Sequence, residues 1–182
     1  MAASRNSIIA IAVVVAGTAG ILVGRWLSER RVVEVTHPAA AAWNPGDEFP
    51  SFLLTSEWGD SLSTGVLLAH GGVVLFLDLE CPPCSDVARK WDRAVSDGVV
   101  PVEQVVAITS QPADAMGRFR KDTGLQIALY RDPGPSFLLN GWITSFPVEV
   151  IVGSDGAVAA VNYDAAAPVD EAALHAALAA SR

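Results

Sequence analysis

The chain has 182 residues, 51% of them hydrophobic, and a formal net charge of −8 at pH 7. This length suits one domain plus an appendage and is sufficient to bury a substantial core. From Asn44 onward the chain carries 18 acidic and 8 basic residues, because four of its arginines lie near the N-terminus. Such an acidic domain repels phosphate backbones, so we expect no nucleic-acid partner.

An unbroken run of apolar or small residues occupies positions 8–24, and Trp26 extends it. A run of this length, with a tryptophan suited to the interface, predicts a transmembrane helix over residues 8–27. A cleaved signal peptide is the alternative, because residues 16–19 offer small side chains at which a peptidase could cut. We favour an uncleaved membrane anchor within residues 1–31.

The segment after the anchor, residues 32–44, shows no amphipathic pattern and predicts a linker. His37 lies in it and is expected to be a solvated linker residue. The turn signal Pro45-Gly46-Asp47 then opens a domain that we expect to fill residues 45–182. We find no internal repeat in the chain.

The most informative stretch of the domain is an apolar run at residues 73–77, followed by Cys81-Pro82-Pro83-Cys84. Five consecutive apolar residues predict a central strand that is buried on both faces. Residues 85–95 predict a helix. A strand, then C-x-x-C, then a helix is the context in which this motif indicates redox chemistry.

The remaining elements predict a mixed α/β domain. A hairpin signal at residues 153–156 separates two apolar runs, and Gly124 closes a helix whose last turn is basic. A hairpin or loop is expected at residues 58–62. Further strands are predicted at residues 49–54, 102–108, 127–130, 148–152 and 157–161, and further helices at residues 113–122, 135–140 and 169–180. This order predicts a mixed central sheet with helices on both faces.

The two cysteines are the only ones in the chain. A dithiol exchanger needs one attacking thiolate and a second thiol close enough to resolve the mixed disulfide. We assign the attack to Cys81, at the helix entrance, and the resolving role to Cys84. A structural disulfide or half of a zinc site is the alternative. Zinc sites normally have four ligands, and His37, His70 and His175 are scattered without paired spacing, so we expect no metal.

The cysteine segment, Leu75-Phe76-Leu77 followed by Cys81-Pro82-Pro83-Cys84, resembles the active-site segment of thioredoxin-fold proteins. The likeness is greater to the membrane-anchored TlpA/ResA-like branch of thiol-disulfide oxidoreductases. Other residues that carry it are Pro45-Gly46-Asp47, Phe49-Pro50-Ser51-Phe52, Phe146-Pro147 and Ser154-Asp155-Gly156.

This resemblance implies a thioredoxin-like fold with a central strand–helix insertion, no cofactor, and a single-pass protein whose domain lies outside the cytoplasm. It implies thiols or disulfides of exported proteins as substrates and a membrane electron donor of the thiol-disulfide type. It also implies that Phe146 and Pro147 form a cis-proline element, in which the backbone before the proline binds the incoming chain. By base rate alone, an X-Pro bond is far more often trans.

Three residues beside the attacking thiol bear on its redox poise. Pro82 and Pro83 have no N–H, so two amides that could stabilise a thiolate at the helix start are missing, and Glu80 adds a negative charge. We therefore expect a disulfide reductase or a mild exchanger, although the helix dipole acts in the opposite direction.

The chain also departs from the patterns of these families. Glu80 stands where many relatives carry tryptophan, Leu75 where thioredoxin has a buried aspartate, and Val87 where ResA-like proteins often have glutamate. No obvious carboxylate therefore remains in those roles to move protons. Asp78 and Glu80 are candidates to replace these carboxylates in proton transfer. The alternative is that both are polar only because the strand ends there and the chain reaches solvent.

Two other functions stay open. The Pro-Gly-Asp and Phe-Pro-Ser-Phe segments also resemble peroxiredoxins, which would imply a thiol peroxidase. Those enzymes place threonine three residues before the peroxidatic cysteine, where this chain has Asp78. A copper-carrying module is the other alternative, since two thiols can hold a soft metal. The copper chaperones that this fold resembles have a C-x-x-x-C motif and a downstream histidine near the site. This chain has neither feature.

Overall fold

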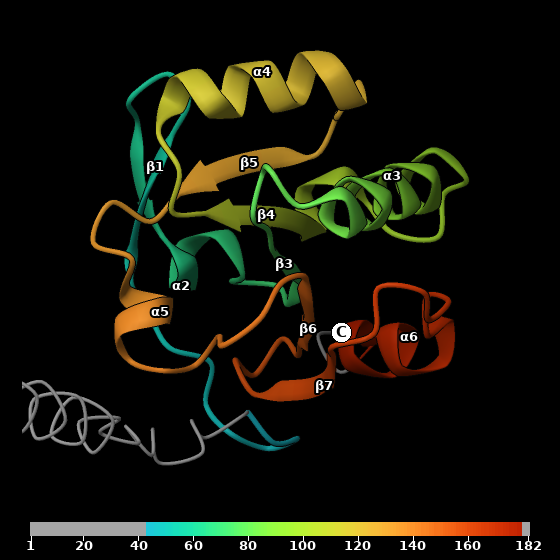
Figure 1. The fold of residues 1–182 in the computed structure, drawn as a ribbon. Helices are drawn as coiled ribbons and strands as arrows, with labels where there is room; N and C mark the ends of the chain where they lie inside the picture. The colour runs from blue at the N-terminus through green and yellow to red at the C-terminus, as the bar shows by residue number, and fades with distance from the viewer. Residues whose placement is uncertain (1–42, 180–182) are drawn as a thin grey trace, which may run out of the picture. The chain divides into compact units, whose positions relative to one another are not determined.

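The computed structural model describes residues 43–179 (Figure 1). The predicted transmembrane helix at residues 8–27 lies outside the described residues, as does nearly all of the predicted linker. Within the described range, no helix is both long enough and apolar enough to cross a membrane.

A seven-stranded mixed sheet forms the centre of the domain, in the order β2-β1-β5-β4-β3-β6-β7. Strands β3, β4 and β5 are parallel to one another, and the outer strands pair antiparallel. The strands are β1 (Leu53–Ser56), β2 (Ser61–Ser63), β3 (Gly72–Phe76), β4 (Val105–Thr109), β5 (Ala128–Arg131), β6 (Val148–Val152) and β7 (Val158–Asn162). The expected mixed sheet is therefore confirmed, and β3, the strand that precedes the cysteine pair, lies at an interior position.

Helices cover both faces of this sheet, as predicted (Figure 1). Helices α3, α4 and α6 pack on one face, and the shorter α2 and α5 pack on the other. The helices are α2 (Thr64–Leu67), α3 (Pro82–Ser96), the 3₁₀ helix η1 (Val102–Gln104), α4 (Ala113–Thr123), α5 (Ser136–Leu139) and α6 (Glu171–Ala179).

Each face of the sheet has its own apolar core. Under α3, Trp91 is almost fully buried together with Leu75, Leu77 and Cys84. The opposite core is aromatic: the ring centroids of Phe76 and Phe137 lie 5.1 Å apart. Strand β3 contributes to both cores, because its successive side chains point to opposite faces. All five of its residues are buried, which explains its continuous apolar sequence.

Two of the predicted turn signals, Gly124 and residues 153–156, are confirmed here. Gly124 ends α4 in the left-handed conformation, at φ +74°, and its N–H bonds the carbonyl of Arg120. Such a backbone suits glycine, which has no Cβ to clash. The β6–β7 hairpin closes where Gly153 N–H donates to the Ala157 carbonyl at 2.8 Å. Gly156, at φ +80°, makes the turn itself.

Several element boundaries differ from those predicted. The first strand begins at Leu53 rather than at residue 49, because the chain before it is fastened by Thr64, whose hydroxyl donates to the Pro50 carbonyl at 2.9 Å. The strand predicted at residues 102–108 opens as the 3₁₀ helix η1, and β4 starts only at Val105. Helix α6 begins at Glu171, two residues later than predicted. Helix α2 was not predicted, since four residues are too few for a helical period.

Candidate active site at the cysteine pair

The cysteine pair lies where β3 gives way to α3. Cys81 is the N-cap of α3, and Pro82 occupies the first helical position, where a missing N–H costs nothing and a fixed φ suits the helix. The first amides of the helix, those of Cys84 and Ser85, both donate to the Cys81 carbonyl, at 3.1 and 3.4 Å. Neither is thereby directed at the Cys81 sulfur.

The two thiols are free and differ in exposure. Cys81 is partly exposed, whereas Cys84 is fully buried. Burial raises the pKa of Cys84 well above its usual range, and a hydrogen bond between its thiol and Cys81 raises that pKa further. A backbone hydrogen bond from Asp78 acts in the opposite direction. The accessible thiol is thus the one that the sequence assigns to attack.

The turn before Cys81 is fixed by side chains on both sides of it. Asp78 receives two amides of its own turn: its Oδ1 accepts from Glu80 N–H at 2.9 Å, and its carbonyl accepts from Cys81 N–H at 3.2 Å. Gln111, just past the end of β4, accepts the Leu79 N–H at 2.6 Å. Sequence reasoning missed Gln111, although it follows a parallel neighbour of β3 and so lies at the same edge of the sheet.

The Phe146–Pro147 peptide bond is cis, as the resemblance implied. Pro147 is buried immediately before β6, whose first residue, Val148, pairs with Phe76. That register carries Phe146 toward the turn that precedes Cys81. Its ring is half-buried and packs against the same core as the two cysteines. Among residues 43–179, no hydrogen bond is found to the backbone N–H or C=O of Phe146, so both remain available to another chain.

The other predicted modulating residues lie on the surface. Pro82 and Pro83 are exposed, and so is Glu80. Asp78 is half-buried. The structure therefore brings together the two cysteines, Asp78 and the Phe146–Pro147 segment, and leaves the carboxylate of Glu80 in solvent beside them.

A buried carboxylate that sequence reasoning did not single out lies under α3. Glu149 on β6 pairs directly with Leu75 and is 5% exposed. It accepts hydrogen bonds from Lys90 Nζ at 2.7 Å, from Asn162 Nδ2 at 3.0 Å and from Trp91 Nε1. The glutamate in the otherwise apolar run of β6 was the signal that could have revealed it.

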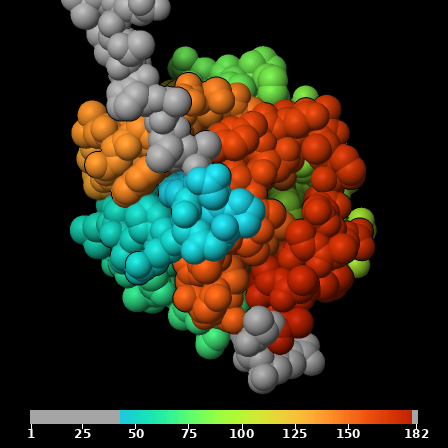
Figure 2. Space-filling model, turned by 90° about the horizontal axis from the view of Figure 1, so that it is seen from below, coloured from blue at the N-terminus to red at the C-terminus, as the bar shows by residue number. Residues whose placement is uncertain are grey.

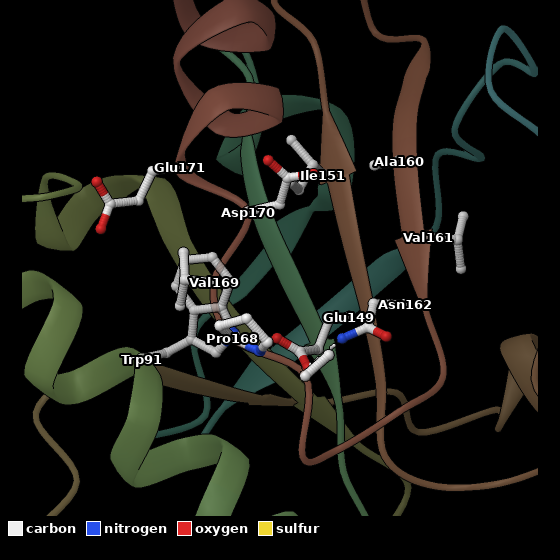
Figure 3. Close-up of a pocket in the computed structure, with 11 residues that line it drawn as sticks. Trp91, Glu149, Ile151, Ala160, Val161, Asn162, Pro168, Val169, Asp170 and Glu171 are labelled. Atoms are coloured by element: carbon white, nitrogen blue, oxygen red, sulfur yellow. Dashed lines mark hydrogen bonds between the residues drawn. The ribbon is translucent and has the colours of Figure 1, made fainter.

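This network lies beside a cavity of about 510 Å³ that does not include the cysteines. Its walls come from β6, β7 and the start of α6, and Trp91 of α3 also lines it (Figure 3). In the space-filling view it is the hollow between the red C-terminal segments, with green atoms at its floor (Figure 2). The buried polar groups at its wall already satisfy one another, so we interpret the network as structural.

Metal ligands are not grouped in the part of the chain that the structure describes: no three His, Cys, Asp or Glu side chains lie close enough together to hold an ion. His70 and His175 are both exposed. His37 lies outside the described residues.

No protein-family model matches this sequence, and no curated protein sequence matches it either. Solved structures do match the three-dimensional arrangement. The domain has a thioredoxin-like fold. A thiol:disulfide interchange protein of the thioredoxin family from Chlorobium tepidum aligns with a TM-score of 0.56 and 19% identity, over 78% of this chain and 99% of that one.

Two Mycobacterium tuberculosis proteins match similarly. The peroxidoxin BcpB aligns with a TM-score of 0.59 and 20% identity, over 77% of this chain and 99% of that chain. A secreted disulfide oxidoreductase homologous to Escherichia coli DsbE aligns with a TM-score of 0.55 and 20% identity, over 71% and 95%. At these identities the likeness shows the fold, which thiol-disulfide exchangers and peroxidoxins share.

Proposed function

We propose that this protein is a thiol-disulfide oxidoreductase of the TlpA/ResA-like kind, acting as a disulfide reductase or mild exchanger on exported proteins. One observation carries the proposal. A partly exposed thiol at a helix N-terminus is followed one turn later by a fully buried thiol, beside a backbone segment with free hydrogen-bonding groups. This arrangement supplies an attacking thiol, a resolving thiol and a place for the substrate chain.

The reaction runs in two exchange steps. The Cys81 thiolate attacks one sulfur of a substrate disulfide, and the other substrate sulfur leaves as a thiolate and takes up a proton. Cys84 then attacks the Cys81 sulfur, which releases the second substrate thiol and leaves a Cys81–Cys84 disulfide. The substrate gains two electrons, and the protein loses two. A membrane electron donor of the thiol-disulfide type would return them.

The substrate chain would lie along Phe146. Its unpaired N–H and C=O offer a strand-like partner, and buried Pro147 fixes their position next to the cysteines. Backbone pairing of this kind is independent of sequence, which suits a protein that acts on several exported partners.

The helix start supports electron flow from this protein to its substrate. Pro82 and Pro83 contribute no N–H, and the first two amides of α3 go to the Cys81 carbonyl. The Cys81 thiolate therefore has little amide stabilisation, and Glu80 adds an adjacent negative charge. A poorly stabilised thiolate disfavours the reduced form, which makes the disulfide hard to reduce and the reduced protein a good donor of electrons.

The direct test is a trapping experiment in the native host. Cys84→Ser should leave a thiol at Cys81 that attacks once and remains disulfide-linked to its substrate, whereas Cys81→Ser should trap nothing. Equal trapping by both variants, or faster alkylation of Cys84 than of Cys81 in the reduced protein, would overturn the assignment.

A thiol peroxidase is the second candidate, because the match to the peroxidoxin BcpB covers almost all of that protein. The rate of reaction with hydrogen peroxide distinguishes the two functions. A peroxidase oxidises its cysteine within seconds at micromolar peroxide, while an exchanger reacts far faster with a disulfide than with peroxide.

The anchor belongs to the same proposal: residues 8–27 would hold the domain at the outer face of the cytoplasmic membrane. Fractionation and protease treatment of spheroplasts decide it. We expect a membrane-bound protein whose domain is digested from outside. A soluble mature protein that begins near residue 20 would contradict the anchor, and protection from external protease would contradict the orientation.

A further inference from the structure

The segment that joins β5 to β6, residues 132–147, carries the backbone of Phe146 outside the sheet (Figure 1). Its one helix, α5, has four residues, which is too short to be stable by helix propensity alone. The position in which Phe146 offers its N–H and C=O to a substrate chain therefore depends on the contacts that fix this segment to the rest of the domain.

Asp132, at the start of the segment, has a side chain that is only 1% exposed. Its Oδ1 accepts the Gly134 N–H at 3.1 Å and the Ser136 hydroxyl at 3.3 Å, and its Oδ2 accepts the Phe137 N–H at 3.3 Å. No ion pair to this carboxylate is found among residues 43–179. Its burial is thus offset by donors of the segment itself, and these bonds fix the first turn of the segment.

The residue is also fastened to the sheet. The Asp132 N–H donates to the carbonyl of Thr109, the last residue of β4, at 2.8 Å. The buried carboxylate of Glu149 differs, because it pairs with Lys90 and joins α3 to β6. Asp132 instead connects the sheet to the segment that leads to Phe146.

Phe137 transmits this fixation to Phe146. Its ring is fully buried, and the ring centroid lies 5.1 Å from that of Phe76 on β3 and 6.2 Å from that of Phe146, with the latter two rings edge to face. Its carbonyl accepts the N–H groups of Trp142 at 3.1 Å and Ile143 at 3.2 Å, which folds the segment back around it. Because such interiors are closely packed, a shift of Phe137 displaces Phe146.

We propose that Asp132 is a positioning residue that, by fixing Phe137, holds the backbone of Phe146 where a substrate chain pairs with it. This inference rests on the proposed function. Asp132 itself touches neither thiol, so its loss should weaken the reaction with a polypeptide disulfide and leave the reactivity of Cys81 unchanged. A small disulfide without a peptide backbone does not use the geometry that Asp132 maintains.

Substituting Asp132→Asn keeps the size of the side chain but leaves one acceptor oxygen in place of two, so at least one donor of the segment loses its partner. The experiment compares two mixed disulfides of thionitrobenzoate, one with an extended peptide that carries a single cysteine and one with mercaptoethanol. Cys81 attacks the peptide or mercaptoethanol sulfur, and thionitrobenzoate leaves with the electron pair of the broken S–S bond. Both probes thus have the same leaving group, whose absorbance reports the rate in a stopped-flow instrument.

With the reduced full-length protein, we expect the wild type to react faster with the peptide probe by about tenfold or more, because pairing orients the disulfide. Asp132→Asn should lose most of this preference and keep its rate with the mercaptoethanol probe. Asp170→Asn is the matched control: its carboxylate accepts the Ala173 N–H at 2.9 Å at the start of α6, and both of its rates should equal those of the wild type.

An unchanged peptide preference in Asp132→Asn, or equal slowing with both probes, would overturn the positioning role and leave the proposed function intact. A wild type that reacts equally with both probes would also overturn the role, because no pairing at Phe146 would exist to be positioned. Release of thionitrobenzoate from neither probe would instead overturn the proposed function. Should Asp132→Asn fail to fold, Ser136→Ala removes one hydrogen bond from Asp132 and should lower the same preference; an unchanged preference in that variant would refute the role.

Discussion

Replacing Glu149 tests how the two halves of the site are held together. Its carboxylate joins α3, which carries the cysteines, to β6, which follows Pro147. Glu149→Leu would strand the Trp91 N–H in the core, at a cost of about 1–3 kcal/mol for an unsatisfied buried donor. It would also break an ion pair whose lysine side chain is only 16% exposed. Removing one partner of a buried pair costs about 3–5 kcal/mol.

Lys90 keeps one partner, since its ammonium also donates to the Ala167 carbonyl at 2.9 Å. We therefore expect Glu149→Leu to lower the free energy of unfolding by about 3 kcal/mol, at the lower end of that range. Urea denaturation of the full-length chain, followed by circular dichroism, measures it. Glu171→Leu is the matched control: it lines the same cavity but is exposed, and should cost less than about 1 kcal/mol.

A double-mutant cycle completes this test. The variant that combines Lys90→Met with Glu149→Leu replaces both charges and should be more stable than the sum of the two single losses predicts. Strictly additive losses, or a loss below about 1 kcal/mol for Glu149→Leu alone, would refute the view that this pair clamps α3 to β6.

Three further predictions concern the site itself. Gln111→Met deprives the Leu79 N–H of its acceptor and should cost about 1–3 kcal/mol in unfolding free energy, whereas exposed Gln126→Met should be near neutral by the same urea assay. Glu80→Gln should shift the redox potential toward oxidising values by less than about 30 mV, because an exposed charge contributes about 1 kcal/mol or less. Thiol alkylation after equilibration with glutathione measures this potential, and a shift toward reducing values would contradict the prediction. The reduced protein should lose stability as pH rises above 9.0, the usual pKa of a cysteine. The reason is that the folded state raises the pKa of Cys84 and holds its proton more tightly than the unfolded chain does. The loss of stability should be weaker in Cys84→Ala.

The sequence predicted those parts of the site that are local along the chain. Strand β3, the C-x-x-C pair and α3 follow one another directly, and each is marked by its own pattern of apolar residues and prolines. The exposure of Cys81 and the burial of Cys84 follow from their positions at the N-cap and one turn into an amphipathic helix. The cis bond before Pro147 was expected only from the family resemblance.

The groups that surround the cysteines were not predicted, because they are brought there by tertiary structure. Gln111 reaches Leu79 across 32 positions of sequence, and Glu149 reaches Trp91 across 58. No periodicity marks such contacts. The predicted start of the first strand was wrong for a related reason. A hydrogen bond from the Thr64 side chain to the Pro50 carbonyl determines the backbone there, rather than the strand propensity of the local sequence.

The central claim is that Cys81 and Cys84 form one reversible dithiol–disulfide couple. Redox titration of the purified full-length protein, with thiols counted by alkylation and mass spectrometry, tests it most directly. We predict that both thiols disappear together in a two-electron transition, with a midpoint nearer to the value of about −270 mV for thioredoxin than to about −120 mV for DsbA. Oxidation of one cysteine without the other, or a dithiol that stays reduced across this range, would contradict the account.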